Sequence, residues 1–210
     1  MKLKPNNIYQ GDCLELIKDI PDNSIDLVLT DPPYGIKADP SPIRGIYRYE
    51  KTNWDDERPK KEYFDEIFRI SKNQIIWGGN YFIDYLYPSM GWIVWDKGRN
   101  FSLSDGELAW TSFQKALRIF SVSRVKALMD GKVHPTQKSL KIMKRCIKYA
   151  DKGSGNKINL ILDPFLGSGT TAVACKELGR KYIGIDISKD YINIAEDRLK
   201  RTKVYNNEYF

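Results

Sequence analysis

Four consecutive residues with strong chemical character, Asp31, Pro32, Pro33 and Tyr34, follow the mostly apolar run of residues 24–30. The two prolines fix their own φ angles and donate no N–H, so they hold the neighbouring carboxylate and carbonyl groups in a stiff corner. Such a corner presents hydrogen-bond acceptors, and the tyrosine ring offers a flat surface for stacking. A plain turn that ends a strand is the alternative interpretation of the same residues.

A second group of chemically informative residues lies in LDPFLGSGTTAVACKELG, residues 162–179. Gly167 and Gly169 stand where a predicted strand passes into a helix, and a missing Cβ there lets a ligand approach the backbone. Asp186 ends the next predicted strand, where a carboxylate can accept hydrogen bonds from ribose hydroxyls. Asp163 would repel a pyrophosphate but attract an ammonium group, which favours S-adenosylmethionine over a dinucleotide. No lysine follows Gly169 as a Walker loop requires, and a tight turn is the remaining alternative.

The elements that must position these residues follow from an alternation of β-branched runs and amphipathic stretches. Strands are predicted at residues 24–30, 73–79, 158–163 and 181–188, and helices at 59–72, 136–150, 170–179 and 191–203. Residues 91–97, 107–113 and 116–122 are expected to be extended. In the helix of residues 59–72, Tyr63, Ile67 and Ile70 share one face. The pattern predicts an α/β fold with a doubly wound, mostly parallel sheet.

Together, TDPPYG and LDPFLGSGTT resemble the amino-methyltransferases of DNA, which use S-adenosylmethionine to methylate adenine N6 or cytosine N4. The order of the motifs, with the catalytic tetrapeptide first and the cofactor loop last, is similar to the beta group of that family. The resemblance spans nearly the whole chain, from GDCLELI at residues 11–17 to YIGIDIS at residues 182–188. It implies the fold of S-adenosylmethionine-dependent methyltransferases, a seven-stranded sheet with helices on both faces.

The resemblance implies catalytic roles for Asp31, Pro32, Pro33 and Tyr34. The carboxylate and the Pro32 carbonyl would accept the amino hydrogens of the target base, so that the nitrogen lone pair points at the sulfonium methyl. Tyr34 would stack on the base, which must leave the duplex to reach the methyl donor. The residues expected to bind the cofactor are Asp12, Cys13, Thr136, Asp163, Phe165, Gly167, Ser168, Gly169, Thr170 and Asp186.

Two segments that border the cofactor leave alternatives open. Asp12 opens an amphipathic run and is equally well explained as the N-cap of a helix. HPTQKSLKIMKRCI, residues 134–147, resembles the family's segment beside the methionine end of the cofactor. Ser139 stands where the family usually has proline, and serine can cap the helix. His134, the only histidine, is interpreted as a hydrogen-bonding loop residue because the chemistry needs no catalytic base.

A single methyltransferase domain is expected over residues 1–210, with catalytic motifs in residues 11–95 and the cofactor-binding region in residues 134–200. Residues 36–58 and 96–132 match neither motif, and we expect them to recognise the DNA target. Both segments are short for a recognition module. A short target site, contacts shared with a second subunit, or both are therefore expected.

The composition of these two segments supports that expectation. The first interleaves arginines with aromatic rings, which suits an extruded strand held by charge and stacking, although a solvated loop explains it about as well. These residues are Arg44, Tyr47, Arg48, Tyr49 and Trp54. The second segment has more basic than acidic residues, which favours phosphate contact. Its basic residues are Lys97, Arg99, Lys115, Arg118, Arg124, Lys126 and Lys132.

Charge and cysteine content bound the class of protein. The 210 residues include 34 Lys and Arg against 27 Asp and Glu, a net charge of +7, which suits a polyanion such as double-stranded DNA and also favours solubility. Three scattered cysteines predict neither a disulfide framework nor a metal site. No apolar run approaches the roughly 18 residues of a membrane span, and no secretion signal opens the sequence. A cytoplasmic protein without membrane contact is expected.

Adenine-N6 methylation of DNA is the leading functional hypothesis, and a homodimer and a cognate restriction endonuclease are open as partners. Cytosine-N4 methylation is a close variant, disfavoured because the family's cytosine enzymes usually carry serine at the position of Asp31. A catalytically idle nucleic-acid-binding subunit is a different class, against which the intact tetrapeptide and glycine loop argue. An NAD-dependent oxidoreductase is disfavoured because no histidine or lysine–tyrosine pair for hydride chemistry accompanies the loop.

Overall fold

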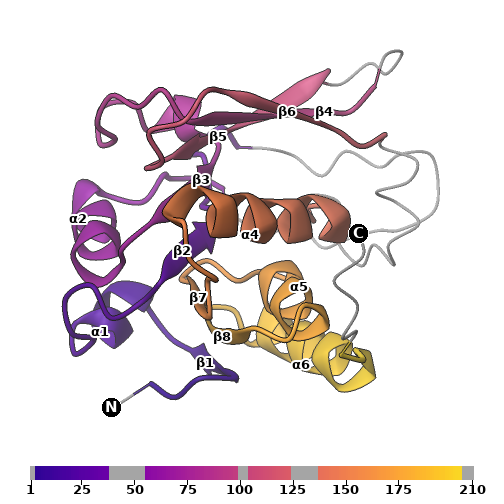
Figure 1. Ribbon diagram of the computed structural model, residues 1–210. Coiled ribbons are helices and arrows are strands. Elements are labelled where there is room, and N and C mark those ends of the chain that lie inside the picture. The colour runs from indigo at the N-terminus through magenta and orange to yellow at the C-terminus, as the bar shows by residue number, and fades with distance from the viewer. Residues whose placement is uncertain (1–2, 38–54, 99–103, 124–136, 205–210) are drawn as a thin grey trace.

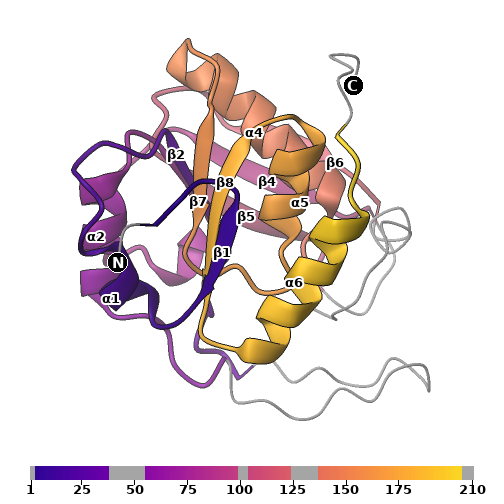
Figure 2. The same ribbon diagram turned by 90° about the horizontal axis from the view of Figure 1, so that it is seen from below.

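The computed structural model describes residues 3–37, 55–98, 104–123 and 137–204, in which one sheet separates two layers of helices (Figure 1 and Figure 2). The eight strands follow the order β1-β8-β7-β2-β3-β5-β4-β6. They are β1 (Asn7–Gln10), β2 (Leu27–Thr30), β3 (Gln74–Trp77), β4 (Trp92–Asp96), β5 (Gly106–Thr111), β6 (Arg118–Ser121), β7 (Leu160–Asp163) and β8 (Lys181–Asp186). The helices are α1 (Cys13–Ile17), α2 (Lys61–Ile70), α4 (Leu140–Ser154), α5 (Thr170–Glu177) and α6 (Lys189–Arg201), with a 3-10 turn, η1 (Gly79–Tyr81).

All but one of the strands in the described sheet run in the same direction. Strands β1, β8, β7, β2 and β3 pair in parallel, and β6 pairs in parallel with β4. Strand β5 is antiparallel to both of its neighbours, β3 and β4. From the centre, the chain winds outward through β3 on one side of β2 and through β8 on the other side of β7. The predicted doubly wound, mostly parallel α/β fold is confirmed.

The edge strand β1 is the element that the sequence pattern did not predict. The family resemblance implies seven strands, whereas the described sheet has eight. The four residues of β1 have exposed side chains at both ends and partly buried ones between them. Such a short polar segment carries no alternation that marks a strand, and its pairing with β8 is what makes it one.

The two helix layers bury opposite faces of the sheet. Helices α4, α5 and α6 lie on one face and α1 and α2 on the other (Figure 2). Leu27 and Leu29 of β2 belong to the core beneath the first layer, and Val28 belongs to the core beneath the second. Because both faces are covered, a central strand reads as an unbroken apolar run.

Helix α2 confirms the predicted element, and its buried face differs from the predicted one in a single residue. Its buried residues are Phe64, Ile67 and Ile70, whereas the prediction placed Tyr63 with the two isoleucines. Tyr63 is partly buried beside this face, and its hydroxyl donates a hydrogen bond to Asp12. The phenol stays at the rim because its polar group finds a partner there, whereas the Phe64 ring has no polar group to satisfy.

Helix α4 starts at Leu140 and continues to Ser154, four residues beyond the predicted end. Ser139 occupies the N-cap position as expected, but its hydroxyl accepts no capping hydrogen bond there. The helix ends where Gly155 adopts φ +73°, a left-handed conformation that glycine takes readily. At 15 residues α4 is the longest described helix, and none of the described helices has the length and apolar character needed to cross a membrane.

The parallel strands bring the two predicted motif groups to one edge of the sheet. Asp31 follows β2, Asp163 ends β7 and Asp186 ends β8, all at the carboxyl ends of their strands. The strand order β8-β7-β2 places Asp163 between the other two aspartates. The chain reverses its winding direction between β7 and β2, and ligands of open α/β sheets bind at such switch points.

Candidate active site

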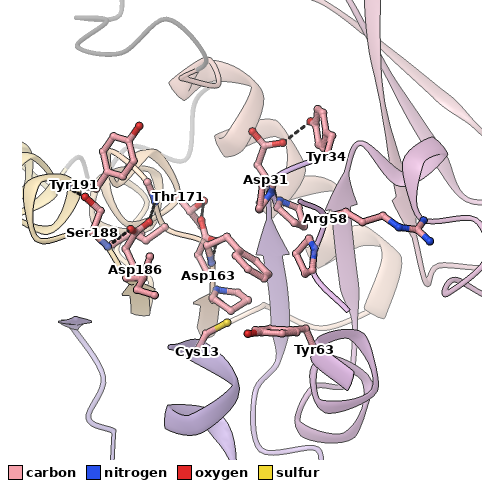
Figure 3. A pocket seen from close by; sticks show the side chains of 18 of the residues that line it. Cys13, Asp31, Tyr34, Arg58, Tyr63, Asp163, Thr171, Asp186, Ser188 and Tyr191 are labelled. Carbon is pink, nitrogen blue, oxygen red and sulfur yellow. Dashed lines mark hydrogen bonds between the residues drawn. The ribbon is translucent and has the colours of Figure 1, made fainter. Parts of the chain in front are cut away.

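A cavity of about 820 Å³ opens at the carboxyl ends of β2, β7 and β8 (Figure 3). Its volume lies in the range of about 300–1,000 Å³ that is typical of small-molecule sites. The cavity brings together both predicted groups of residues. Those that line it are Asp12, Cys13, Asp31, Pro32, Pro33, Tyr34, Asp163, Phe165, Gly167, Ser168, Thr170 and Asp186. Thr136 and His134 lie outside the described residues.

The two glycines of the cofactor loop have different surroundings. Gly167 lines the cavity with φ +53°, and a Cβ built on it would meet nothing within 4 Å. Gly169 does not line the cavity. Its φ is +83°, and a Cβ would lie 2.7 Å from the Cβ of Ala195 in α6. Gly167 thus leaves the backbone open to a ligand, and Gly169 allows α5 and α6 to pack closely.

The carboxylate of Asp186 is held by two backbone amides. Gly167 N donates to Oδ2 at 2.7 Å, and Ser188 N donates to Oδ1 at 2.8 Å. Burial raises the pKa of Asp186, and these two amides oppose the rise. Each oxygen keeps a second acceptor position, because a carboxylate oxygen has two lone pairs. Asp186 therefore remains able to accept hydrogen bonds from hydroxyl groups of a ligand.

Asp163 joins three segments beneath the cavity. Its Oδ1 accepts hydrogen bonds from Thr30 Oγ1 at 2.7 Å and from Phe165 N at 3.1 Å. Its Oδ2 accepts from Thr171 Oγ1 at 2.6 Å. Burial raises the pKa of Asp163 to about 7, although these hydrogen bonds oppose the rise. The carboxylate thus ties the end of β2 to the start of α5, a structural task that the sequence argument did not foresee.

The helix-cap interpretation of Asp12 is confirmed. Its Oδ1 accepts a hydrogen bond from Leu14 N at 2.9 Å, and the Tyr63 hydroxyl lies 3.1 Å from both oxygens. The Tyr63 ring packs against Phe165, with centroids 6.0 Å apart. Cys13 is buried next to this pair, and burial raises the pKa of its thiol. Sequence reasoning placed Tyr63 on the apolar face of its helix but missed its place at the cavity, where its ring helps to form an apolar wall.

Ser168 and Thr170 are held in place by Arg198 of α6. The guanidinium donates to the Ser168 carbonyl at 2.6 Å and to Thr170 Oγ1 at 3.1 Å. Burial lowers the pKa of Arg198, which still has a high enough ordinary value to stay charged. No local pattern predicts this contact, since Arg198 lies on a helix 28 residues after Thr170.

The corner at residues 31–34, to which the family resemblance assigns catalysis and which we call the catalytic corner, is closed by Asp31 and Tyr34. The Tyr34 hydroxyl donates to Asp31 Oδ1 at 2.5 Å, and Lys138 Nζ donates to Oδ2 at 2.6 Å. Burial raises the pKa of Asp31, and the Lys138 ammonium opposes that rise. Each carboxylate oxygen has a second lone pair beyond the one that accepts these hydrogen bonds, and Asp31 lines the cavity. The corner can therefore still accept an amino hydrogen.

The Tyr34 ring is packed on more than one side. It stacks on Tyr81 of η1, with centroids 4.7 Å apart and planes 16° apart. Gly78 has φ +66°, and a Cβ there would lie 2.1 Å from the Tyr34 ring. The sequence predicted a ring free to stack on a base. In the structure Tyr81 covers one of its faces.

Known sequences similar to this chain are DNA methyltransferases. Residues 94–197 match a family described as DNA methylase, N6_N4_Mtase. The chain is 28% identical to the type II methyltransferase M.HinfI of Haemophilus influenzae, in a match covering 97% of this chain and 70% of the relative. It is also 28% identical to M.HpaI of Haemophilus parainfluenzae, with 90% and 72% covered. These matches support a DNA amino-methyltransferase.

Solved structures agree with the fold of this methyltransferase. The crystal structure of the M1.HpyAVI–SAM complex has a TM-score of 0.59 at 25% identity and covers 91% of this chain and 98% of that one. The cytosine-N4-specific PvuII methyltransferase has a TM-score of 0.61 at 17% identity, covers 98% and 89%, and shows the fold alone. Membership of the beta group remains a prediction from motif order.

The residues at the cavity fit the cofactor expected for a methyltransferase of this family. Asp186 keeps acceptor positions for ribose hydroxyls, and Gly167 leaves its side of the loop open. Tyr63, Phe165 and the buried Cys13 form an apolar wall suited to a flat purine ring. S-adenosylmethionine has both ribose hydroxyls and a purine ring, together with a charged amino-acid end.

Asp55 fixes the backbone of the methyltransferase after the catalytic tetrapeptide. Its Oδ1 accepts hydrogen bonds from Tyr34 N at 2.6 Å and from Gly35 N at 2.9 Å. Asp55 is only 3% exposed. Sequence reasoning placed it in a long functional loop but gave it no role, because an acidic residue in a polar stretch has no distinguishing pattern.

Lys138 is the second residue that sequence reasoning missed at the catalytic corner. Its Nζ contacts Asp31 Oδ2 and lies 3.2 Å from the Tyr34 hydroxyl and 2.9 Å from Glu107 Oε2. It lies two residues after the His-Pro-Thr part of a segment that resembles a cofactor motif of the family. That closeness to the motif is the signal in the sequence that could have pointed to Lys138.

The structure describes only part of the predicted target-recognition segments. The residues singled out in the first segment lie outside the described residues, as do Arg99, Arg124, Lys126 and Lys132 of the second. Lys97 is 15% exposed and its Nζ pairs with Glu107 Oε1 at 2.5 Å, so Glu107 already balances its charge. The role of the two segments in target recognition stays a prediction.

Proposed function

We propose that this methyltransferase transfers a methyl group from S-adenosylmethionine to the N6 amino group of an adenine extruded from double-stranded DNA. The observation that carries the proposal is the shared cavity. Asp31 and Pro32, which would bind the amino group, line the same cavity as Gly167 and Asp186, which would bind the methyl donor. The two reactants would therefore meet in one place.

The chemistry of Asp31 and Pro32 would overcome the weak nucleophilicity of the adenine amino group. Its lone pair is delocalised into the ring. The Asp31 carboxylate would accept one amino hydrogen and the Pro32 carbonyl the other, which favours a pyramidal nitrogen with a localised lone pair. The prolines hold both acceptors in place, and Asp55 holds the backbone that follows them. When bound, S-adenosylmethionine supplies an electrophilic methyl group on sulfur.

The cofactor would lie across the ends of β7 and β8. Asp186 would accept hydrogen bonds from its ribose hydroxyls, while Cys13, Tyr63 and Phe165 would face its adenine. Asp12 already uses one lone pair to cap α1. It would accept a hydrogen bond from the adenine amino group with one of its remaining lone pairs. Asp163, Ser168 and Thr170, together with Thr136, would be assigned to the methionine end. Gly169 would act indirectly, through the packing of α5 on α6.

Adenine is favoured over cytosine by the residue that opens the tetrapeptide. The family's cytosine-N4 enzymes usually have serine there, and this chain has Asp31. Asp31 is also held as a hydrogen-bond acceptor at both oxygens. Cytosine-N4 methylation is the second candidate, because the same family methylates both amino groups.

The position of the catalytic corner supports extrusion of the base. The acceptors lie at the wall of a cavity, and no such cavity can reach an amino nitrogen inside a base stack. The extruded adenine would stack on Tyr34, either on the face opposite Tyr81 or after displacing the Tyr81 ring. A cognate restriction endonuclease is proposed as a further partner, by analogy with type II methyltransferase relatives. A second copy of this chain is proposed because both predicted recognition segments are short.

Mass spectrometry of digested product DNA tests the proposal directly. DNA from cells expressing the chain should contain N6-methyladenine, and single-molecule sequencing of that DNA would give the target site. N4-methylcytosine would overturn the choice of base. No methylated base in any DNA or RNA offered would favour an idle binding subunit instead.

A fluorescence experiment tests extrusion separately. Unpairing costs a few kcal/mol and is easier at a mismatch, so affinity should rise for duplexes with a mismatched target. 2-Aminopurine at the target position should brighten on binding as it leaves the stack. Unchanged fluorescence with a duplex that the enzyme methylates would contradict extrusion.

A further inference from the structure

Four charged side chains form a connected group at the catalytic corner, which we call the ion cluster: Asp31, Lys138, Glu107 and Lys97. Lys138 Nζ lies 2.6 Å from Asp31 Oδ2 and 2.9 Å from Glu107 Oε2, the latter as an ion pair without the alignment of a hydrogen bond. Lys97 Nζ lies 2.5 Å from Glu107 Oε1. The cluster alternates in sign along its length and carries no net charge.

Lys138, at the centre of the ion cluster, is shielded from solvent and depends on its charged neighbours. The Lys138 side chain is 7% exposed and that of Glu107 is 26% exposed. A buried ammonium without a partner is strongly destabilising. Burial alone would lower the pKa of Lys138, but the charges of Asp31 and Glu107 outweigh burial and raise it well above its usual value. Lys138 is therefore a permanent cation beside Asp31.

Two rigid elements set the position of the Lys138 ammonium. Lys138 directly precedes Ser139, the N-cap residue of α4. Glu107 lies on β5 and is paired in register with Trp95 of β4. Neither element carries the catalytic tetrapeptide or the cofactor loop. The ammonium is thus positioned by parts of the fold that are separate from both motifs.

The contacts of Lys138 determine how Asp31 can act. Its ammonium occupies one carboxylate oxygen while the Tyr34 hydroxyl occupies the other, so rotation of the carboxylate would break both contacts. Lys138 Nζ also lies 3.2 Å from the Tyr34 hydroxyl, which links the two anchors. The carboxylate is held in one orientation at the wall of the cavity.

We propose that Lys138 is a positioning residue for methyl transfer: it holds Asp31 as an ionised, oriented carboxylate for the target amino group, and Glu107 balances its charge. The inference rests on the proposed function, in which Asp31 accepts an amino hydrogen. Only the ionised carboxylate has the acceptor capacity at both oxygens that this role requires.

Glu107 explains how a cation can lie so close to the catalytic corner. S-adenosylmethionine is positively charged at its sulfur, and a lone ammonium nearby would repel it. Glu107 supplies a second negative charge to Lys138. The Lys138 and Lys97 ammoniums in turn lower the pKa of Glu107 to about 2, against the effect of burial, so that it stays ionised.

The test measures single-turnover methylation of an adenine-containing duplex as a function of pH, together with the affinity for S-adenosylmethionine by calorimetry. The variants are Lys138→Met, Lys138→Arg, Glu107→Gln and the double variant that combines Lys138→Met with Glu107→Gln. Glu177→Gln is the matched control, because Glu177 forms a partly buried ion pair with Lys144 between α5 and α4, at 2.7 Å. That pair belongs to the helix layer and lies outside the cavity lining.

Lys138→Met should slow single-turnover methylation about 10- to 100-fold, as expected for loss of a hydrogen bond to a charged group. The pH at which the rate is half-maximal should rise, because the ammonium no longer opposes the effect of burial on Asp31. The affinity for S-adenosylmethionine should stay within about twofold, since Lys138 acts on the substrate side. Lys138→Arg keeps the charge and should restore much of the rate.

Glu107→Gln should not raise the pH at which the rate is half-maximal, in contrast to Lys138→Met. Glu107 raises the pKa of Asp31 by its negative charge, so its removal should leave the half-maximal pH unchanged or lower it. The rate should fall less than in Lys138→Met. The titratable groups that face Asp31 are Tyr34 in its own corner, Lys138 before α4, Glu107 on β5 and Asp163 on β7. Tyr34 and Asp163 are the same in every variant, so differences between profiles report on Lys138 and Glu107.

The outcomes separate this inference from the proposed function. A wild-type protein that methylates no adenine overturns the proposed function and the inference with it. A wild-type protein that is active, with Lys138→Met within twofold of its rate and with the same pH profile, overturns the inference alone. If Lys138→Met loses cofactor binding, the double variant, which removes one positive and one negative charge, decides between a positioning role and a purely structural role. Bound cofactor with slow transfer and a raised half-maximal pH supports the inference, and lost binding in that variant too makes Lys138 a structural residue only.

Discussion

Gly78→Ala is expected to destabilise the fold through one contact with the catalytic corner. Gly78 has φ +66°, and a Cβ there would lie 2.1 Å from the Tyr34 ring, where carbon atoms normally keep about 3.5 Å apart. The left-handed backbone costs an alanine about 1–2 kcal/mol. The overlap adds about 1–3 kcal/mol, as overpacking usually does. The free energy of unfolding should therefore fall by about 2–5 kcal/mol in total, measured by urea denaturation.

The same substitution should slow methylation without weakening cofactor binding. A displaced Tyr34 ring would withdraw its hydroxyl from Asp31, to which it donates at 2.5 Å. Gly78 is absent from the cavity lining, so the affinity for S-adenosylmethionine should stay close to that of the wild type. Single-turnover assays and calorimetry on folded protein measure these two effects independently.

Gly155→Ala separates the contact from the backbone strain. Gly155 ends α4 with φ +73°, and a Cβ there would meet nothing within 4 Å. This control should lose only the backbone contribution of about 1–2 kcal/mol and keep its methylation rate. Equal losses of stability in the two alanine variants, or a wild-type rate in Gly78→Ala, would refute the reasoning.

Three further predictions concern the aspartates at the sheet edge. Asp31→Ala should abolish methyl transfer and leave cofactor binding nearly intact, and turnover retained within a few-fold would contradict its role. Asp186→Ala should weaken S-adenosylmethionine binding by about 1.5–3 kcal/mol, and calorimetry showing the wild-type affinity would rule that role out. Asp163 has a pKa raised by burial to about 7, so the folded state binds its proton more tightly than the unfolded state. Stability should therefore fall as pH rises from about 4 to about 7, and Asp163→Asn should flatten this part of the wild-type pH profile.

The catalytic corner and the cofactor loop could be predicted because their signals are local in the sequence. In the first motif, Asp31 and two prolines directly follow a strand. In the second, the glycines lie between a strand and a helix. In both, the functional residues are adjacent in sequence to the element that positions them. The parallel arrangement of strands then brings their carboxyl ends together without further information. This reasoning correctly placed Asp31, Asp163 and Asp186 at one edge of the sheet.

The contacts that support the corner could not be predicted, because they join distant segments through the three-dimensional packing. Lys138 meets Asp31 across 107 positions of sequence, and Asp55 meets Tyr34 across 21. The position of Glu107 depends on β5 running antiparallel between β3 and β4, a direction that an extended segment does not reveal. From sequence alone, a charged residue is predicted to be exposed to solvent, because its buried partner is known only once the fold is known.

The parallel pairing of β2 with β7 has a consequence for how genes of this kind can be arranged. The two strands are neighbours in the sheet although more than a hundred residues separate them in the chain. Their carboxyl ends would lie side by side whichever strand the ribosome made first. A rearrangement that exchanged the two halves of the coding sequence would therefore preserve the site, provided that new connections spanned the old ends. The reaction therefore does not require the two motifs to follow one particular order along the chain.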